Sequence, residues 1–349
     1  MKIFVTARFD QDELKKLAKT GAQIEQAGFG ITGQKLDEDE LVLKLADVDI
    51  AIIEFENITD KVLTAAKKLK YLACLRNEPA ASVDIAAANR LRIPVLFAPG
   101  RNAISVAEHT LGLMFSIARH IATTHHLLRY TDELTSITYN DKVGDRQTIT
   151  SEWSMDPRAP FQRFQGEELF EKTAGIVGFG LIGREIGKRL RALGMQLLVF
   201  DPYVAQEQLK EFSAQKVDLE TLARESDFVV IAAKVTEETK GLFSARCFNL
   251  MKPTSFFINT ARAAIVDYEA LIESLSAKKI AGAALDVYPI EPLPEDSRLR
   301  KLENVVLTPH LAGASRQVVK HHSRMVVADV LEIIKGNKPK YLFNPEVLK

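Results

Sequence analysis

The chain has 349 residues, of which 46% are hydrophobic and 26% charged, so it is long enough for two globular domains. Lys plus Arg and Asp plus Glu both total 46, and the resulting net charge of zero gives no overall field to attract nucleic acid or an anionic membrane. The two cysteines, Cys74 and Cys247, belong to no metal-binding pattern, and no apolar run approaches the length of a membrane span. We therefore expect a cytoplasmic protein with reduced thiols and no metal, whose partner is a small molecule rather than nucleic acid or a membrane.

Short apolar runs alternate with amphipathic stretches over residues 1–100. Strands are predicted at 2–7, 49–55, 71–75 and 93–98. Helices are predicted at 10–20, 37–47, 59–69 and 84–91. Strands that alternate with helices are typical of parallel βα units, so this part of the chain should form an α/β sandwich.

A long stretch with helical periodicity follows at 105–130, and it predicts a helix that leaves one domain and enters the next. Ser105 stands at the position of an N-cap, with Glu108 at the capping-box position. Residues 131–165 then lose all periodicity and predict a long loop, which is a feature of functional or disordered segments.

A second series of βα units is predicted beyond residue 165. Its strands are expected at 175–179, 197–201, 227–233, 255–261, 280–287 and 305–309. A helix at 182–194 follows the first of these strands, and a final helix follows Ser315. The sequence therefore predicts a second α/β domain with a mainly parallel sheet.

The sharpest motif is GxGxxG at Gly178, Gly180 and Gly183, directly after a predicted strand and at the start of a helix. Gly178 permits the tight turn, Gly180 lets a pyrophosphate approach the backbone, and Gly183 lets the helix pack close to the sheet. The N-terminus of that helix supplies free N–H donors. We expect this motif, including Leu181 and Ile182, to bind the pyrophosphate of NAD.

Asp201 ends the next predicted strand, where the adenosine ribose of a dinucleotide should lie. Its carboxylate can accept hydrogen bonds from both ribose hydroxyls and repels a 2′-phosphate, which predicts a preference for NAD over NADP. Lys234, at the end of the neighbouring strand, is the one cation that we expect to weaken this preference.

Three ionisable residues follow three further strands of the second domain, namely Arg262, Glu291 and His310. Ligands of such sheets bind beyond the carboxyl ends of the strands. Oxidation of a 2-hydroxy acid needs a base near neutral pH, which a histidine supplies, and a glutamate bonded to the other ring nitrogen orients the ring. An arginine offers a planar fork for the substrate carboxylate.

The order of these motifs resembles that of the D-isomer-specific 2-hydroxyacid dehydrogenases, a family that includes D-3-phosphoglycerate, D-lactate, glycerate and formate dehydrogenases. The resemblance extends along nearly the whole chain and rests on five segments, at 98–110, 175–187, 258–267, 282–294 and 307–315. It implies that Arg262, Glu291 and His310 are the catalytic residues.

The resemblance also implies two doubly wound parallel-sheet domains. A Rossmann NAD-binding domain, 105–313, would be inserted in a discontinuous flavodoxin-like substrate domain, 1–104 and 314–349. A homodimer would form through the NAD-binding domain, with the long helix after residue 104 at the interface. Further cofactor contacts are expected from Thr260, Ala261, Asp286 and Gly313. Substrate contacts are expected from Arg76, Asn77, Asn102 and Arg262.

The chain departs from the family pattern near both ligands. Ala263 replaces the usual glycine after the catalytic arginine, residues 232–236 lack the usual His and Pro, and residues 76–79 replace a glycine-rich substrate loop. The identity of the 2-hydroxy acid substrate therefore stays open, and D-3-phosphoglycerate-like and sugar-acid-like substrates are both considered. Two other functions also stay open: an NAD-binding corepressor-like interaction protein, and a formate- or phosphite-type dehydrogenase.

Overall fold

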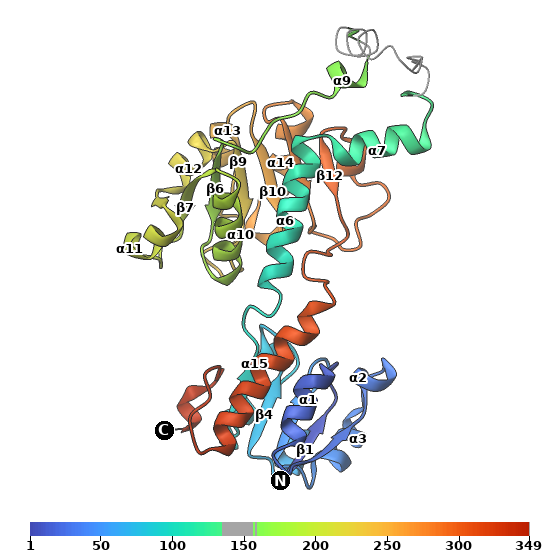
Figure 1. Ribbon diagram of the computed structural model, residues 1–349, viewed down its shortest axis with the longest axis vertical. Helices are drawn as coiled ribbons and strands as arrows, with labels where there is room; N and C mark the ends of the chain where they lie inside the picture. The colour runs from blue at the N-terminus through green and yellow to red at the C-terminus, as the bar shows by residue number, and fades with distance from the viewer. Residues whose placement is uncertain (135–155, 158, 349) are drawn as a thin grey trace, which may run out of the picture. The chain divides into compact units, whose positions relative to one another are not determined.

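The computed structural model describes residues 1–134, 156–157 and 159–348. The chain divides into two compact units, and the second interrupts the first along the sequence. The first unit contains Met1–Asn102 and Ala314–Lys349, and the second contains Ala103–Gly313 (Figure 1). Each unit is built around one sheet in which all paired strands are parallel.

The first unit has a five-stranded sheet in the order β2-β1-β3-β4-β5, which is the flavodoxin-like order. Its strands are β1 Lys2–Val5, β2 Gln23–Gln26, β3 Ile50–Ile53, β4 Tyr71–Cys74 and β5 Val95–Phe97. Its α-helices are α1 Gln11–Ala18, α2 Phe29–Thr32, α3 Glu38–Leu45, α4 Asp60–Ala65, α5 Ile85–Arg90 and α15 Gln317–Ile334. Short 3-10 turns occur at η1 Pro79–Ala81 and η5 Pro345–Leu348. The order confirms the fold predicted for this part of the chain.

Helices cover both faces of this sheet. The central strand β3 is apolar and buried along its whole length, as expected for a strand covered on both faces. One core cluster contains side chains of α3, α4 and α5, and the other contains side chains of α1 and α15. Figure 1 shows α15, from the C-terminal segment, beside α1 from the N-terminal segment. The two sequence segments therefore share the hydrophobic core on one face of the sheet.

The second unit has a seven-stranded sheet in the order β12-β11-β10-β9-β6-β7-β8, a doubly wound arrangement that confirms the second predicted sheet. Its strands are β6 Thr173–Val177, β7 Gln196–Phe200, β8 Ala214–Lys216, β9 Phe228–Ile231, β10 Phe256–Asn259, β11 Gly282–Leu285 and β12 Val305–Leu307. Its α-helices are α6 Ala103–Ala118, α7 Ile121–Tyr130, α9 Pro160–Arg163, α10 Leu181–Ala192, α11 Gln206–Leu209, α12 Leu219–Glu225, α13 Ala245–Leu250 and α14 Tyr268–Ser276. Its 3-10 turns are η2 Lys210–Phe212, η3 Ala263–Ile265 and η4 Arg298–Lys301.

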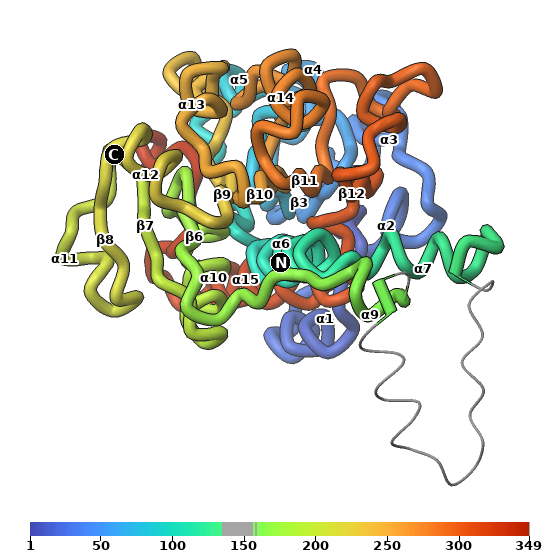
Figure 2. The backbone as a smooth tube through the Cα atoms, turned by 90° about the horizontal axis from the view of Figure 1, so that it is seen from above, coloured from blue at the N-terminus to red at the C-terminus, as the bar shows by residue number. Residues whose placement is uncertain are grey.

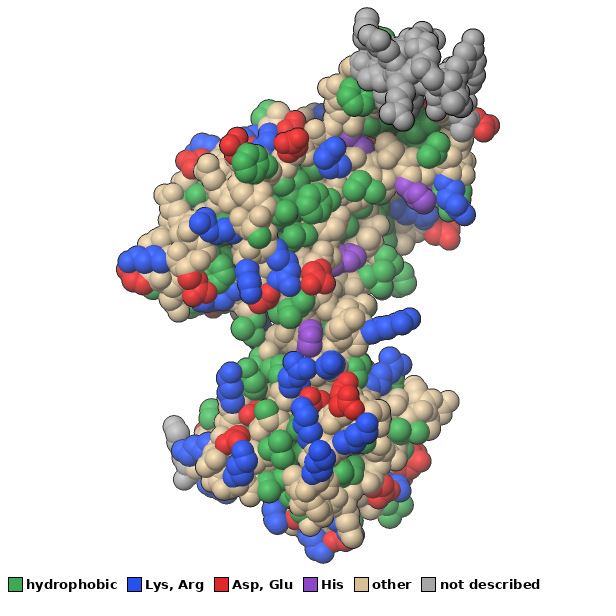
Figure 3. All heavy atoms as spheres, in the orientation of Figure 1, with side chains coloured by type: hydrophobic (Ala, Val, Ile, Leu, Met, Phe, Trp, Pro, Cys, Tyr) green, Lys and Arg blue, Asp and Glu red, His purple; other side chains and the backbone are tan. Residues whose placement is uncertain are grey.

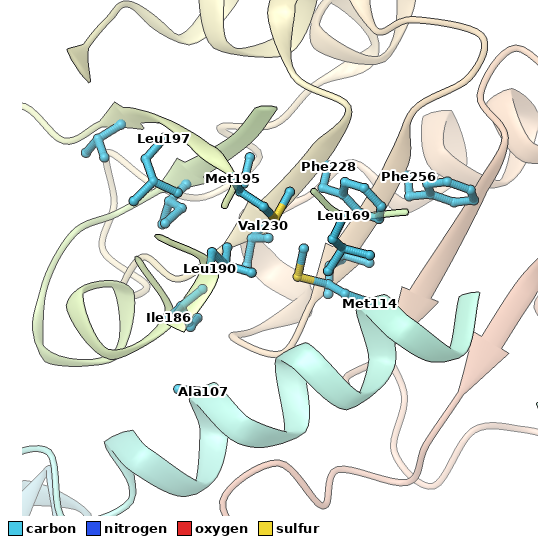
Figure 4. Packing of buried hydrophobic residues seen from close by; sticks show 14 of the residues in the cluster. Ala107, Met114, Leu169, Ile186, Leu190, Met195, Leu197, Phe228, Val230 and Phe256 are labelled. Atoms are coloured by element: carbon cyan, nitrogen blue, oxygen red, sulfur yellow. The ribbon is translucent and has the colours of Figure 1, made fainter. Parts of the chain in front are cut away.

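Figure 2 shows α6 and α10 on one face of the second sheet and α13 and α14 on the other. Met114 of α6 and Leu190 of α10 point into the same buried cluster beneath the strands, together with Leu169 and Met195 (Figure 4). The opposite face is filled by α12, α13 and α14. This packing holds the strands rigidly, so their carboxyl ends form a fixed platform.

The long helix predicted at 105–130 is two helices. The first begins at Ala103, so Ser105 is a buried residue inside α6 and not its N-cap. The break comes at His120, whose φ of 53° is left-handed. There the N–H of Glu167 donates to the carbonyl of Ala118 at 2.9 Å, so the returning chain satisfies the end of α6.

Two further differences concern weakly patterned segments. The loop predicted at 131–165 contains α9, and residues 135–155 and 158 lie outside the described part. Strand β8 was not predicted, because its three residues are mostly exposed and polar and show no apolar run. It is an edge strand that pairs only with β7 among the described strands.

The C-terminal segment is fastened to the first unit by the buried carboxylate of Asp329. It accepts hydrogen bonds from the N–H groups of Lys340 at 2.7 Å and Tyr341 at 3.0 Å. The Tyr341 carbonyl then accepts from the N–H of Phe97 in β5 at 3.2 Å. Asp329 therefore holds the segment that covers the edge of this sheet.

We expect Asp329→Ala to remove the charged acceptor of both N–H groups and to destabilise the first unit by about 1.5–3 kcal/mol. Hydrogen exchange measured by mass spectrometry should show faster exchange in peptides of the first unit and unchanged exchange in the second. The control is Glu332→Ala, which removes an exposed carboxylate from the same helix. Equal exchange in both variants would contradict the anchoring role.

Candidate active site

The carboxyl edge of the second sheet collects the residues that the sequence singled out. Strand β6 leads into Gly178, and β7 leads into Asp201. At the other side of the sheet, β10 leads towards Arg262, β11 into Asp286 and β12 towards His310. Because the strands are parallel, all these residues lie at one edge of the sheet.

The glycine motif has the shape of a phosphate cradle. Gly178 has a φ of 92°, and a Cβ there would lie 2.5 Å from the backbone of Ala233. A Cβ on Gly183 would lie 2.3 Å from the carbonyl oxygen of Gly178. A Cβ on Gly180 would meet nothing within 4 Å, so this glycine faces open space. Gly180 is also the N-cap of α10 and offers no side-chain acceptor, so the first N–H groups of that helix are available to an anion.

Asp201 is tied to this cradle. One carboxylate oxygen accepts from the N–H of Phe179 at 2.8 Å, and the other accepts from the N–H of Tyr203 at 2.9 Å. Each oxygen keeps a lone pair for a further donor, so these bonds still permit contact with ribose hydroxyls. The carboxylate therefore also fixes the turn after Gly178.

A surface pocket beside Asp201 has a lysine, Lys216, among its lining residues. Its lining residues are Phe200, Asp201, Pro202, Lys216, Val217, Asp218 and Thr221. Lys216, on the unpredicted strand β8, donates from Nζ to the carbonyl of Val204 at 2.7 Å. No local motif marks Lys216, because only the pairing of β8 with β7 brings it here.

His310 and Glu291 form a hydrogen-bonded pair. The Nδ1 atom of His310 lies 2.6 Å from Oε2 of Glu291, and Oε1 of Glu291 accepts from the N–H of Tyr288 at 2.9 Å. This leaves Nε2 of His310 for proton transfer. Burial alone raises the pKa of Glu291, but these hydrogen bonds and the charges of His310 and Arg262 outweigh it and lower the pKa. Glu291 is therefore ionised at neutral pH and stabilises the imidazolium form of its partner.

Hydrogen bonds within its own turn hold both the backbone and the side chain of Arg262. The buried side chain of Asn259 accepts from the N–H of Ala261 at 3.0 Å and donates to the carbonyl of Arg262 at 3.2 Å. The Arg262 side chain is exposed, and its Nη1 donates to the Ala261 carbonyl at 2.6 Å. Asn259 had not been selected from the sequence, although its place at the end of β10 was a usable signal.

Asp286 shapes the loop that carries His310. It is fully buried, and its oxygens accept from the N–H groups of Leu311 and Ala312, both at 2.8 Å, and from the Thr308 hydroxyl at 2.5 Å. Burial alone raises the pKa of Asp286, but hydrogen bonds from His109, Thr308 and these N–H groups lower it. The contact of Asp286 with the nicotinamide stays a prediction.

The other expected cofactor residues line the same edge. Thr260 is buried, with its hydroxyl 2.8 Å from that of Thr110 in α6, so it contributes to packing. Leu181 is exposed at the start of α10, and Ile182 is partly buried. Ala261 and Gly313 are partly exposed.

The expected substrate residues of the first unit lie together at the carboxyl edge of its own sheet. The amide of Asn77 donates to Oδ1 of Asn102 at 3.0 Å and accepts from the N–H of Gly100 at 2.8 Å. Arg76 donates to the hydroxyl of Ser82 at 3.1 Å. An ion pair between partly buried Arg101 and buried Glu54 at 2.6 Å, not predicted from the sequence, lies at the same edge.

The described part of the chain contains neither a metal-binding cluster nor a membrane-spanning helix. No three His, Cys, Asp or Glu side chains there are grouped to hold a metal ion. No helix there is both long and apolar enough to cross a membrane.

Known proteins share both the sequence pattern and the fold. The family model for the NAD-binding domain of D-isomer specific 2-hydroxyacid dehydrogenases matches residues 111–312. The putative 2-hydroxyacid dehydrogenase YoaD of Bacillus subtilis is 34% identical, with 100% of this chain and 96% of YoaD covered. D-3-phosphoglycerate dehydrogenase of Archaeoglobus fulgidus is 33% identical over 96% of this chain, which spans only 58% of that protein.

A solved structure supports the fold assignment. The NAD complex of the D-isomer specific 2-hydroxyacid dehydrogenase from Lactobacillus delbrueckii ssp. bulgaricus aligns with a TM-score of 0.78. The alignment covers 99% of this chain and 100% of that one, at 20% identity, and so shows a common fold. From the family match and the full-length relative, the chain belongs to the D-isomer specific 2-hydroxyacid dehydrogenases and is an NAD-dependent oxidoreductase.

Proposed function

We propose that this protein interconverts a D-2-hydroxy acid and its 2-keto acid, with His310 as the acid/base, Glu291 as its charge partner and Arg262 as the carboxylate receptor. The observation that carries the proposal is the 2.6 Å contact between His310 Nδ1 and Glu291 Oε2. Because Nδ1 is bound to Glu291, Nε2 is the ring nitrogen left for proton transfer, and the Glu291 carboxylate lies beside the imidazolium that forms.

In the direction of reduction, Nε2 of the His310 imidazolium gives its proton to the keto oxygen. Glu291 stabilises the imidazolium before the transfer and orients the neutral ring after it. Arg262 holds the substrate carboxylate with its guanidinium fork. The carbonyl carbon would gain its hydride from NADH, and hydride and proton together would give the hydroxy acid.

The cofactor-binding role is proposed for the carboxyl edge of the second unit. The cradle of Gly178, Gly180 and Gly183 fits a pyrophosphate. Of these three glycines, only Gly180 has no atom within 4 Å of an added Cβ, so the ligand can approach the backbone there. Asp201 would receive the adenosine ribose. We accordingly assign NAD binding to residues 105–313 and substrate binding to 1–104 and 314–349, together with Arg262. The free, buried Cys74 and Cys247 agree with the proposed cytoplasmic location.

We further propose a homodimer formed through the second unit. Helix α7 has no buried residue, and Leu128 and Tyr130 on it are 64% and 67% exposed. Figure 3 shows hydrophobic side chains gathered over the neighbouring helix α6 on the face in view. Exposed apolar surface of this kind is typical of an interface, and a second copy of the chain would cover it.

Removal of the acid/base should nearly abolish turnover. We expect His310→Ala to lower kcat for keto-acid reduction by a factor on the order of 10²–10⁴ while NADH binding, measured by fluorescence titration, is retained. In Glu291→Gln the imidazolium loses its negative partner, so kcat for keto-acid reduction should also fall. Glu295→Gln is the matched control. Near-normal turnover by His310→Ala would remove the basis of the assignment.

The cradle makes a separate prediction. Gly180→Ala places a methyl group in open space, so folding should be unaffected while the Kd for NADH rises at least about tenfold, because the methyl group occupies the approach of the pyrophosphate. Gly183→Ala, whose Cβ meets a backbone oxygen at 2.3 Å, should instead lower the melting temperature. Unchanged NADH affinity in folded Gly180→Ala would contradict the cradle.

The proposed interface can be tested by light scattering coupled to gel filtration. The double variant Leu128→Lys/Tyr130→Lys should elute with the mass of one chain, whereas the wild type should have the mass of two, because burying two ammonium groups is unfavourable. Leu43→Lys, at a position 79% exposed on α3, should remain dimeric. A dimeric double variant would exclude α7 from the interface.

A further inference from the structure

The side chain of His109 reaches the base of the loop that carries His310. His109 lies on α6, which packs against β11 and β12. Its Nε2 atom is 3.2 Å from Oγ1 of Thr308 and 3.5 Å from Oδ1 of Asp286. The side chain is only 26% exposed, so most of it is enclosed. The reaction proposed above assigns no role to this histidine.

The hydrogen bonds of Thr308 determine which atom of His109 carries a hydrogen. Oγ1 of Thr308 lies 2.5 Å from Oδ1 of Asp286. Burial raises the pKa of Asp286, but its hydrogen bonds outweigh burial and lower the pKa, so the carboxylate is ionised at neutral pH and can only accept. Thr308 therefore donates its single hydroxyl hydrogen to Asp286 and accepts from His109. His109 consequently carries a hydrogen on Nε2.

Asp286 in turn fixes the backbone around His310. Its Oδ1 and Oδ2 atoms accept from the N–H groups of Leu311 and Ala312, both at 2.8 Å, and its main-chain carbonyl accepts from the N–H of His310 at 2.8 Å. His310 has a φ of 55°, in the left-handed region that non-glycine residues rarely adopt. Such a conformation persists only where its surroundings hold it. The orientation of the Asp286 carboxylate therefore helps to set the direction of the His310 side chain.

A purely packing role for His109 would place a different demand on its side chain. Packing requires the volume of the ring, whereas the chain of hydrogen bonds requires an N–H group at the position of Nε2. Leucine fills space but has no donor. Glutamine has an amide N–H group at the end of a side chain of similar reach. Leucine and glutamine at position 109 therefore distinguish a packing role from a hydrogen-bonding role.

We propose that His109 is a positioning residue for the acid/base His310. Its Nε2–H donates to the Thr308 hydroxyl, the hydroxyl donates to the Asp286 carboxylate, and Asp286 holds the backbone that presents His310. Without the first donor, Thr308 and the carboxylate have one hydrogen bond fewer to fix their orientation. All four residues belong to the second unit. The inference rests on the proposed function, in which His310 transfers the proton.

The experiment measures kcat and KM with NADH and the keto acid that the wild type reduces fastest among pyruvate, glyoxylate, hydroxypyruvate and 3-phosphohydroxypyruvate. His109→Leu should lower kcat about tenfold or more and change KM less than about twofold, because the proton donor is misplaced while the carboxylate receptor is not. His109→Gln should keep kcat within about threefold of the wild type, because the amide replaces the Nε2–H donor. Fluorescence titration counts NADH-binding sites, and kcat is expressed per site, so a loss of folded protein cancels.

The order of the hydrogen bonds makes a second expectation. In His109→Leu/Thr308→Val, kcat should equal that of Thr308→Val alone, because His109 acts through Thr308. If His109→Leu yields no protein that binds NADH, the comparison of Thr308→Val with Thr308→Ser takes its place, since serine keeps the hydroxyl. Glu108→Gln is the matched control, because Glu108 is the neighbouring residue of α6 and its side chain is 65% exposed. It should keep the wild-type kcat.

Three results would overturn the positioning role and leave the proposed function intact. They are a wild-type kcat in His109→Leu, a kcat in His109→Gln as low as in His109→Leu, and equal kcat values in Thr308→Val and Thr308→Ser. No turnover of any of the four acids by the wild type would overturn the proposed function and, with it, this inference.

Discussion

Parallel strand pairing is the constraint on which this structure depends. In both units every paired strand runs in the same direction, so all carboxyl ends meet at one edge of each sheet. Residues distant in sequence, such as Gly178 and His310, are thereby brought to one edge without direct bonds between them. The chemistry of each unit is concentrated where the strands end and the loops begin.

Carboxylates at the strand ends then position these loops, and of these Asp286 and Glu56 are buried while Asp201 is partly buried. Asp286 holds the N–H groups beside His310, Asp201 holds the turn after Gly178, and Glu56 holds the turn that presents Phe29. A charged acceptor forms stronger hydrogen bonds to N–H groups than a neutral one, and burial protects them from competition with water. In each case one acidic side chain orders a segment that has no regular secondary structure to order it.

The reactive groups themselves remain accessible. His310 and Arg262 are exposed, whereas the residues that orient them, Asp286 and Asn259, are fully buried. The buried residues hold the backbone in place, and the exposed residues are free to contact a ligand. A rigid support lets an exposed side chain keep one geometry.

The sequence by itself determined the two parallel sheets, because the apolar runs of β3, β6 and β10 are buried on both faces and alternate with amphipathic helices. It also selected Arg262, Glu291 and His310 through their places after strands, and Gly178, Gly180 and Gly183 through a local motif. Only the tertiary structure decided the break at His120, the position of Lys216 on β8 and the ion pair of Arg101 with Glu54. These features depend on contacts between distant segments or on polar residues without a periodic pattern, and neither leaves a signal in local sequence.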